Sequence, residues 1–478
     1  MQDDYRSETL VQDTIHGYVT LTSATGDCHP EERYFERDLI DSAWLQRLRQ
    51  IRQLQTAWLV YPTAEHSRFQ HVLGTMWTAS RAWAQWRTSF YRAMSEAGQT
   101  DAPSSACVEE LLRIAALLHD VGHGPFGHFL DEHFFSRYET SQHERLTHET
   151  LGAHIIRTEL APYISGLRRS PSGLFGPGES ISADEVAYLI TRPQVGRQEA
   201  DRPLWLKTLR CLFCGLYTVD NIDFVMRDAY MTGFGSNPFD LDRLLHYTFF
   251  TPQGLTVHAK GVATVMRFIQ IRADLFRAVY YHRATRAIDV ELADLFKDSV
   301  DLLYPYGNPV ESLQEYLRFT DFSLLSDVRN WDRSDDPRKR ALATPWREFL
   351  ERKIKWKLLA EKTIFFAGEQ SEESSIFSSP RLFEAALREK LPTQFQETEL
   401  RFDIARHSLL PETTQTRNFW YDPETEQVAP IGSHKSFAQS AKSFRICRVF
   451  GASSEAREAV VKALLRLTQG VVDETTNL

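Results

Sequence analysis

Residues 111–131 read LLRIAALLHDVGHGPFGHFLD, and they predict a buried helix that ends in a glycine-punctuated turn. The positions before His119 are too densely apolar for a surface helix. An imidazole beside a carboxylate is expensive to bury without a partner. A divalent metal ion is the most economical partner, because imidazole suits transition metals and carboxylate suits harder cations. The polar side chains that follow the helix are His119, Asp120, His123, His128 and Asp131.

The composition is that of an ordinary globular protein with room for a large core. The chain has 478 residues, of which 42% are hydrophobic and 25% charged, and its length predicts two or three domains. The formal net charge of −9 argues against a broad basic surface for duplex DNA. One local basic pocket is compatible with this charge, and a nucleoside triphosphate needs no more.

The five cysteines do not form a disulfide framework in so long a chain. Cys211 and Cys214 make a lone CxxC in an apolar, helical context, which favours core packing over zinc or redox use. Residues 1–10 carry no leader pattern, and no window approaches about 18 consecutive apolar residues. We therefore expect a cytoplasmic protein without a membrane span. The other cysteines are Cys28, Cys107 and Cys447.

Apolar spacing predicts a mainly α fold. Helices are expected over residues 41–59, with Asp41 as N-cap, and from His71 to about residue 94. Two more long helices are expected over residues 204–232 and 260–300, the second rich in arginine and tyrosine.

Two regions depart from this helical pattern. Residues 1–30 predict a small β element, and short β-like runs alternate with helices and loops after residue 310. We therefore expect a helical core over residues 1–310 and a smaller α+β C-terminal lobe over residues 311–478, with a regulatory or oligomerisation role.

Acidic residues interrupt the apolar stretch that ends at residue 232. Asp220 shares a helix face with Arg227 and Asp228, whereas Asp223 is expected to point elsewhere. An acid in such a helix needs a partner, and Arg227 is the ordinary one.

Single histidines are weak signals, because a histidine at a helix start, such as His66 or His71, is more often structural than a ligand. The order His71, His119-Asp120, Asp220 is a stronger signal, since it is the signature of the HD phosphohydrolases. The chain resembles their dNTP triphosphohydrolase branch, which includes bacterial dGTP triphosphohydrolases and the vertebrate SAM-and-HD-domain dNTPase. The resemblance covers roughly residues 10–300, and no SAM domain precedes this region. It rests on IHGYVTL, QRLRQIRQL, SRFQHVLGT, ALLHDVGHGPFGH, THET and VDNIDFVMRDAYMTG.

The resemblance implies a role for each matching residue. The metal set would be His71, His119, Asp120 and Asp220, and this mixed ligation suits Mn, Fe, Mg or Ni, with Zn a less distinctive fit. The catalytic set would be His128 as general acid, Asp131 to orient it, and His123 and His148 at the phosphate. The substrate-binding set would be Gln53, Arg68, Phe224, Asp228, Arg272 and Tyr280.

The reaction implied is hydrolysis of a dNTP at the α-phosphorus, which releases a deoxynucleoside and inorganic triphosphate. Tyr280 would crowd the 2′ position and so exclude ribonucleotides. The chain departs from the family pattern at three positions. Gln55 replaces a glycine, and Asn221 and Phe224 replace a lysine and a tyrosine. These departures concern the base and sugar preference rather than the metal.

A second nucleotide site is a further implication. Asp41, Gln46 and Arg49 match residues that read a guanine nucleotide between subunits in the vertebrate enzyme, although Arg49 has the simpler alternative of pairing with an acid. Family members usually assemble, so we expect a homo-oligomer: a dimer, tetramer or hexamer. The expected ligands are a dNTP substrate and an activating nucleotide, with single-stranded nucleic acid left open.

Two other functions stay open at this stage. One is an HD phosphohydrolase or nuclease that acts on a nucleoside monophosphate, a cyclic dinucleotide or a DNA end, which the loss of a lysine at Asn221 favours slightly. The other is a nucleotide sensor with little catalysis, although so many buried polar groups would then lack a purpose. Balancing dNTP pools and antiphage defence are both compatible with the expected reaction.

Overall fold

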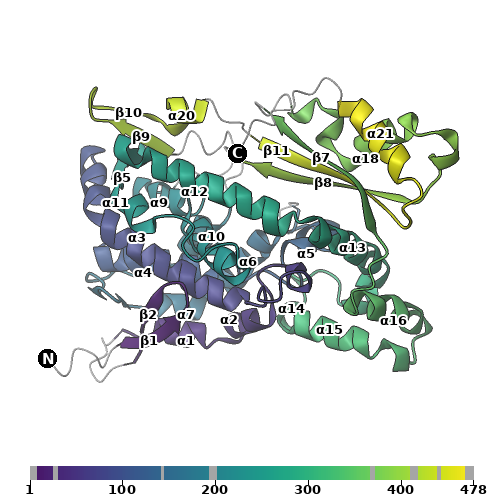
Figure 1. The fold of residues 1–478 in the computed structure, drawn as a ribbon. Helices are drawn as coiled ribbons and strands as arrows, with labels where there is room; N and C mark the ends of the chain where they lie inside the picture. The colour runs from purple at the N-terminus through teal and green to yellow at the C-terminus, as the bar shows by residue number, and fades with distance from the viewer. Residues whose placement is uncertain are drawn as a thin grey trace.

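The computed structural model describes residues 8–24, 31–140, 145–192, 202–366, 372–409, 418–438 and 443–468. Cys28 lies outside these ranges. The described chain is mainly α, as predicted, and it places a helical layer beside a smaller sheet (Figure 1).

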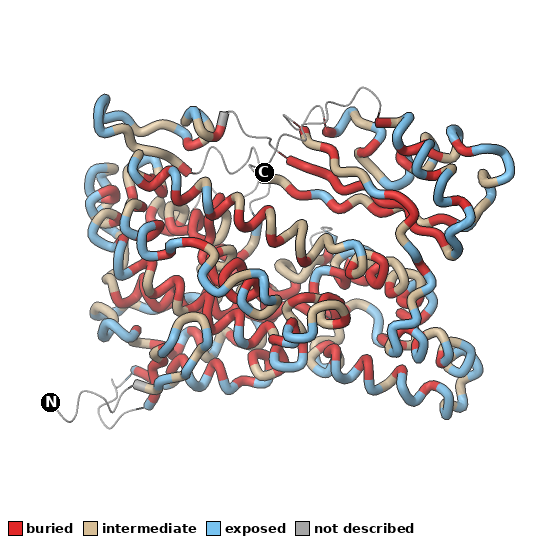
Figure 2. Tube along the Cα trace, viewed as in Figure 1, coloured by how far each residue is buried: buried red, intermediate tan, exposed pale blue. Residues whose placement is uncertain are grey.

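The helical layer is built around α3 (Arg68–Glu96) and α4 (Ser105–Leu118), which pack along one another, with α10 (Val219–Met231) against α3. Their contact faces are apolar, and buried backbone fills the centre of the layer (Figure 2). The other helices of the layer are α1 (Glu36–Ile40), α2 (Ala43–Arg47), α5 (His128–His133), α6 (His148–Thr158), α7 (Ala161–Ser165), α8 (Ala183–Ile190), α9 (Leu204–Leu209), α11 (Leu241–His246), α12 (Val262–Leu275), α13 (Arg283–Leu303), α14 (Leu313–Arg318), α15 (Asp321–Arg329) and α16 (Pro337–Leu350).

Two small β units flank these helices. The predicted N-terminal β element is a hairpin of β1 (Glu8–Asp13) and β2 (Gly17–Thr22). A four-stranded sheet has the order β10-β9-β6-β5, in which β6 pairs with β9 in parallel although the two strands are far apart in the sequence. Its strands are β5 (Thr248–Thr251), β6 (Gly254–His258), β9 (Asn418–Asp422) and β10 (Gln427–Pro430). Two further strands of two residues each, β3 (Arg169–Ser170) and β4 (Gly173–Leu174), pair with one another beside the helical layer.

The C-terminal sheet has the antiparallel order β7-β11-β8, with β7 at Lys357–Phe366, β8 at Leu400–Ser408 and β11 at Ser443–Gly451. Helices α18 (Pro380–Lys390) and α21 (Arg457–Thr468) pack on it and share a separate apolar core with it. Helices α14 to α16 bury their apolar residues in the core of the helical layer. The domain boundary at residue 310 stays a prediction.

Three expected long helices are broken, and long-range or capping hydrogen bonds explain the breaks. The first ends at α2 and a 3-10 turn, because residues 51–56 bond to the chain before α3: the Gln53 N–H donates to the His66 carbonyl over 3.0 Å, and the Arg68 N–H to the Ile51 carbonyl over 2.9 Å. Asp41 is accordingly the C-cap of α1 rather than an N-cap.

The other two breaks fall at capping residues. The Thr218 side chain accepts from the Asn221 N–H and starts α10 afresh, which separates it from α9. The stretch 260–300 divides into α12, a π-helical turn over Phe276–Tyr280, and α13, which the His282 side chain caps.

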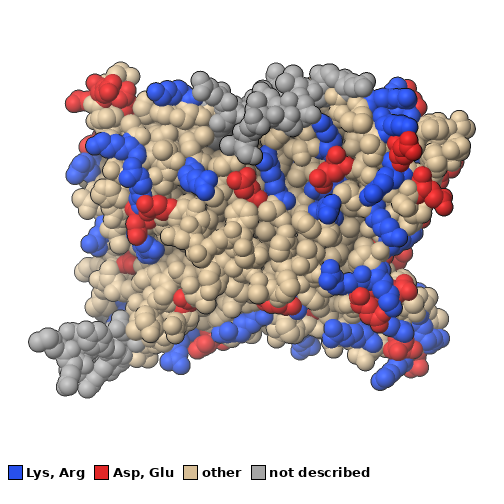
Figure 3. Space-filling view, viewed as in Figure 1, with Lys and Arg blue, Asp and Glu red and all other residues tan. Residues whose placement is uncertain are grey.

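The surface carries no large field of one charge on the face drawn in Figure 3, where Lys and Arg mix with Asp and Glu around a mostly uncharged centre. Among the described residues, no helix combines the length and the apolar content needed to cross a bilayer. Cys211 lies in the core, and its thiol donates to the Thr208 carbonyl over 3.0 Å, in line with the packing interpretation.

Candidate metal centre and active site

Three helix ends bring the predicted metal ligands together. His71 lies in the first turn of α3, His119 is the C-cap of α4, and Asp220 lies in the first turn of α10. Asp220 Oδ1 is 3.1 Å from His71 Nε2 and 3.6 Å from His119 Nε2, and the two Nε2 atoms are 3.3 Å apart. These three groups form a compact ligand set on a rigid scaffold.

Hydrogen bonds at the other ring nitrogens determine what this set can hold. His71 Nδ1 lies 2.8 Å from Asp223 Oδ2, and His119 Nδ1 lies 2.8 Å from the Ala116 carbonyl. Both partners accept hydrogen bonds, so each Nδ1 carries the proton of the neutral ring, and each Nε2 presents a lone pair. In the neutral rings, two lone pairs and a carboxylate oxygen lie within 3.6 Å of one another, so the residues fit a divalent metal in place of a proton between His71 and Asp220.

The electrostatics of His71 agree with a site built for positive charge. Burial alone would lower the pKa of His71, but the hydrogen bonds to Asp220 and Asp223 outweigh it and raise the pKa to about 10. The same contacts hold the pKa of Asp220 below its ordinary value in spite of burial.

Asp120 lies at the edge of this set. Its Oδ1 is 3.4 Å from His119 Nε2, while its Oδ2 is 3.9 Å from His71 Nε2 and accepts from Arg68 Nη1 over 2.5 Å. Burial opposes the charged form, but His119 and Arg68 hold the pKa of Asp120 well below its usual range. Arg68, expected at the substrate phosphate, is thus paired with an expected metal ligand in this structure.

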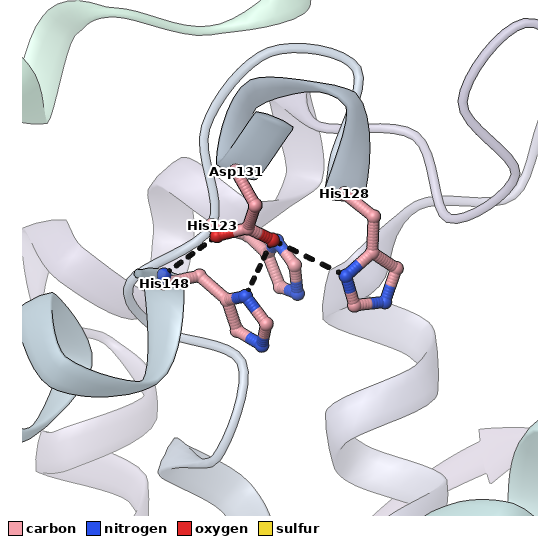
Figure 4. Close-up of side chains that lie close together, drawn as sticks. All are labelled: His123, His128, Asp131 and His148. Carbon is pink, nitrogen blue, oxygen red and sulfur yellow. Dashed lines mark hydrogen bonds and ion pairs between the residues drawn. The ribbon is translucent and has the colours of Figure 1, made fainter. Parts of the chain in front are cut away.

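A second cluster consists of Asp131 with His123, His128 and His148 around it (Figure 4). Asp131 accepts at Oδ2 from His148 Nδ1 over 2.7 Å and at Oδ1 from the His148 N–H over 2.8 Å. His128 Nδ1 lies farther from Asp131 Oδ2, at 3.3 Å. Asp131 therefore fixes His148 more firmly than the His128 that it was expected to orient, and the His128 side chain is 67% exposed.

His123 links the two clusters. Its ring stacks on His148 with centroids 3.8 Å apart, and its Nε2 is 3.4 Å from Asp120 Oδ1. The side chain is fully buried, yet neither ring nitrogen makes a hydrogen bond with any described residue. Burial, and then the Arg68 charge, lower the pKa of His123 well below its usual value. A neutral, buried imidazole whose ring nitrogens make no hydrogen bond suits a ligand that supplies polar atoms of its own.

The turn between these histidines needs its glycines. Gly127 has φ +55°, and a side-chain carbon there would lie 2.4 Å from Arg68 Nη2. The turn can therefore pass over the Arg68 guanidinium only without a side chain at this position.

The expected sugar-binding residues lie together around Asp228. This buried carboxylate accepts from His66 Nε2 over 2.7 Å and from the Tyr280 hydroxyl. The Phe224 ring packs edge-on to Tyr280, with centroids 6.4 Å apart. The Oε1 atom of Gln53 is buried and has no hydrogen-bond partner in the described part of the chain.

Arg272 is placed less openly than expected for a phosphate contact. Its guanidinium is buried and donates to the Leu216 carbonyl over 3.0 Å and to the Leu409 carbonyl over 3.4 Å. Burial lowers its pKa to about 10.

Two residues of the expected nucleotide-activator site pair with one another, and Gln46 Nε2 also donates to the carbonyl of Ile40, the residue before Asp41, over 2.9 Å. Arg49 donates to Gln46 Oε1 over 2.8 Å and stacks on the Phe69 ring, 3.6 Å from its centroid. Asp41 is exposed and lies 3.6 Å from Arg37 instead. The simpler alternative was that Arg49 pairs with an acid. In the structure Arg49 pairs with the side-chain amide of Gln46 instead.

Sequence reasoning missed Asp223, which holds His71, and His16, which holds Asp223. We expected Asp223 to point away from the site and Arg227 to serve Asp220. In the structure Arg227 binds Asp223 and Asp13 instead. The available signal was the spacing of Asp220 and Asp223, since residues three apart on a helix are neighbours.

Comparison with known proteins agrees with this geometry. Residues 68–191 match the HD domain, and this range includes both helix ends that supply His71 and His119. The chain is 23% identical over 411 residues to a deoxynucleoside triphosphate triphosphohydrolase SAMHD1 homolog of Dictyostelium discoideum, covering 83% of this chain and 72% of that protein. The chain therefore contains an HD domain and is similar over most of its length to proteins named as dNTP triphosphohydrolases.

Three further proteins are similar to this chain to different extents. Human deoxynucleoside triphosphate triphosphohydrolase SAMHD1 is 25% identical over 347 residues, or 68% of this chain, which spans only about half (51%) of the human protein. The Uncharacterized protein YwfO of Bacillus subtilis is 26% identical over 360 residues, with 73% of this chain and 71% of that one covered. A crystal structure of a hypothetical protein from Aquifex aeolicus has the same fold, with a TM-score of 0.65, 21% identity and coverage of 96% of this chain and all of that one.

The HD-domain match and the cluster of His71, His119 and Asp220 support phosphohydrolase activity and binding of a divalent metal. The HD-domain match includes His119 and Asp120 but ends before Asp220. The roles of the individual site residues stay predictions.

Proposed function

We propose that this HD-domain protein hydrolyses dNTPs at the α-phosphorus to a deoxynucleoside and inorganic triphosphate. The observation that carries the proposal is the contact between the two clusters: Asp120 Oδ1 lies 3.4 Å from His119 on the metal side and 3.4 Å from His123 on the imidazole side. A phosphate at this junction would meet ligands for a metal and groups for proton transfer at once. The names of the family's dNTP triphosphohydrolases support the same substrate class.

Each side chain has a distinct task in this proposal. His71, His119 and Asp220, with Asp120 at the edge, would hold the metal, which supplies Lewis acidity toward the phosphate. His123 is the buried imidazole available to a phosphate oxygen, with Arg68 beside it. His128, exposed and held at Nδ1 by Asp131, has its Nε2 available to protonate the leaving 5′-oxygen.

The sugar would lie against Asp228, Tyr280 and Gln53. The unpartnered Oε1 of Gln53 can accept from a 3′-hydroxyl, and the Tyr280 ring, tethered to Asp228, leaves little room for a 2′-hydroxyl. Phe224 makes one wall of this region apolar, where a family tyrosine would offer a hydroxyl.

Further parts of the proposal concern assembly and regulation. We include a homo-oligomer and activation by a second nucleotide near Gln46 and Arg49, with Asp41 recruited only if the assembly rearranges. A cytoplasmic location belongs to the same proposal. The proposed metal ion is one of Mn, Fe, Mg, Ni and Zn.

The first test is a product assay. The protein is incubated with each dNTP and Mn²⁺ or Mg²⁺, with and without a second nucleotide, and the products are separated by ion-exchange chromatography. We expect a deoxynucleoside and intact triphosphate. Release of pyrophosphate, or no turnover in any mixture, would contradict the proposal and move the search to the other phosphoesters, which the loss of a lysine at Asn221 favours.

Variants separate the two clusters. His119→Ala with Asp120→Ala should abolish bound metal, measured by mass spectrometry, together with activity. His128→Ala should lower turnover about 10²- to 10⁴-fold while the metal stays bound. His258→Gln, on β6 and outside both clusters, should leave both unchanged. Full activity in the double variant would overturn the assignment of the site.

A further inference from the structure

Asp223 is a fully buried carboxylate with three partners, and one of them belongs to the metal centre. Its Oδ2 lies 2.8 Å from His71 Nδ1 and accepts from Arg227 Nε over 2.9 Å. Its Oδ1 lies 2.6 Å from His16 Nε2 and accepts from Arg227 Nη2 over 3.0 Å. Both carboxylate oxygens are therefore held from two directions, so the acceptor for His71 cannot rotate away.

The N-terminal hairpin supplies the far end of this arrangement. Asp13 Oδ2 accepts from Arg227 Nη1 over 2.9 Å, and Asp13 Oδ1 accepts from the backbone N–H groups of Ile15 and His16 over 2.9 and 3.0 Å. The same aspartate thus shapes the turn that presents His16 and anchors that turn to α10. In Figure 1 the hairpin of β1 and β2 lies at the lower left of the helical layer, beside α1.

We propose that Asp223 is a positioning residue for the metal centre, held in place by Arg227 on its own helix and by His16 and Asp13 of the N-terminal hairpin. Asp223 accepts the Nδ1 proton of His71, which leaves the Nε2 lone pair directed at Asp220 and His119. A carboxylate behind a metal-binding histidine fixes the tautomer and the ring orientation, and it strengthens the histidine as a ligand. This inference rests on the proposed function only in taking the His71, His119 and Asp220 set as a metal site.

A purely structural role predicts a different result. If Asp223 only neutralised Arg227, its loss would lower the stability of the protein but leave the metal affinity of the folded molecule unchanged. If it positions His71, its loss weakens metal binding in protein that is still folded. Metal affinity and stability must therefore be measured separately.

The test uses Asp223→Asn in the full chain. Asparagine keeps the size and one acceptor oxygen but loses the charge, and it cannot accept from His71, His16 and Arg227 together. The metal is removed by chelation, and Mn²⁺ alone is titrated calorimetrically, with folding followed by circular dichroism. We expect Mn²⁺ affinity to fall about 10- to 100-fold, the usual effect of losing such a partner.

Two further variants keep the test decisive. Glu109→Gln removes another buried carboxylate, one that binds Ser80 and Ser170 near the opposite end of α4, and should bind Mn²⁺ like the unchanged protein. His16→Leu removes the hairpin's hydrogen bond to Asp223 and leaves that carboxylate paired with Arg227, and it should lower Mn²⁺ affinity about 10-fold. The His16 variant also tests the positioning role of Asp223 if the Asp223→Asn protein does not fold.

Unchanged Mn²⁺ affinity in the folded Asp223→Asn protein or, if that variant does not fold, in the His16→Leu protein would overturn the inference. Because no nucleotide is present, this result is distinguishable from failure of the proposed function. A protein that hydrolyses no dNTP but loses Mn²⁺ affinity in these variants would refute the dNTPase proposal alone.

Discussion

Gly74 is the residue at which α3 leaves room for the buried ion pair of α10. A side-chain carbon there would lie 2.0 Å from Asp223 Oδ1 and 2.2 Å from Arg227 Nη2. Gly74→Ala should therefore lower the free energy of unfolding by about 1–3 kcal/mol, even though alanine favours helix. Urea unfolding measures this effect. Gly235→Ala, where no atom lies within 4 Å, is the control, and an equal change in both variants would contradict the steric explanation.

His407 on β8 makes a second residue-scale prediction, because it is buried beside two arginines. Burial, and then the charges of Arg272 and Arg277, lower its pKa from 6.5 to about 3. Between these values the unfolded chain takes up a proton that the folded protein does not, so stability falls as the pH falls through 6.5 toward 3. At pH 5 the loss is about 2 kcal/mol relative to pH 7.5.

Replacing His407 isolates this contribution. In His407→Leu, the difference between the unfolding free energies at pH 7.5 and pH 5 should shrink by about 2 kcal/mol, measured by urea unfolding at both values. His246→Leu, at an exposed position on α11, should keep the difference of the unchanged protein. An identical pH difference in all three proteins would show that His407 is protonated in the folded state.

At the scale of elements, Arg286 joins α13 to the C-terminal sheet. Its Nη2 binds Asp403 on β8 over 2.5 Å, and its Nη1 binds Asp289 on its own helix over 3.2 Å. Arg286→Ala leaves two buried carboxylates short of a partner and should cost about 3 kcal/mol, the lower end for a broken buried pair because Arg448 still reaches Asp403 at 3.5 Å.

The exposed Arg283, at the start of the same helix, provides the comparison. Arg283→Ala should change the unfolding free energy by less than about 0.5 kcal/mol. A double-mutant cycle between Arg286 and Asp403 then measures their coupling directly. A coupling near zero would show that this ion pair does not hold α13 to the sheet, and would leave the Arg401–Asp294 pair and the apolar contacts to do so.

The elements also show what could be predicted from sequence. The helix ends near His71 and His119 were predictable because each lies in a local pattern of apolar spacing and turn residues, whereas the start of α10 beside Asp220 was hidden inside one expected helix. Asp223 was not, since its partners His71 and His16 are 152 and 207 residues away in the chain. The long helices were predicted as continuous because a capping hydrogen bond or a bond to a distant carbonyl outweighs apolar periodicity at each break.

For the whole molecule, the parallel pairing of β6 with β9 connects the middle of the chain to its C-terminal part. The fully buried Asn418 begins β9, and its Oδ1 accepts from the Leu216 N–H, just before α10, over 2.8 Å. Asn418→Ala leaves that donor unpaired and should cost about 1–3 kcal/mol in thermal or urea unfolding. Glu424→Ala, in the exposed turn after β9, is the control. Equal stability of both variants would show that water replaces the Asn418 contact.

This pairing sets an order of events during synthesis. The polypeptide leaves the ribosome N-terminus first, so the start of α10 emerges about 200 residues before β9, whose Asn418 bonds to the residues just ahead of that helix. Until β9 arrives, β6 presents an open edge of the kind that nascent chains use to pair with the wrong neighbour. A chaperone would therefore protect the nascent chain while the residues between β6 and β9 are being synthesised and the edge of β6 is unpaired.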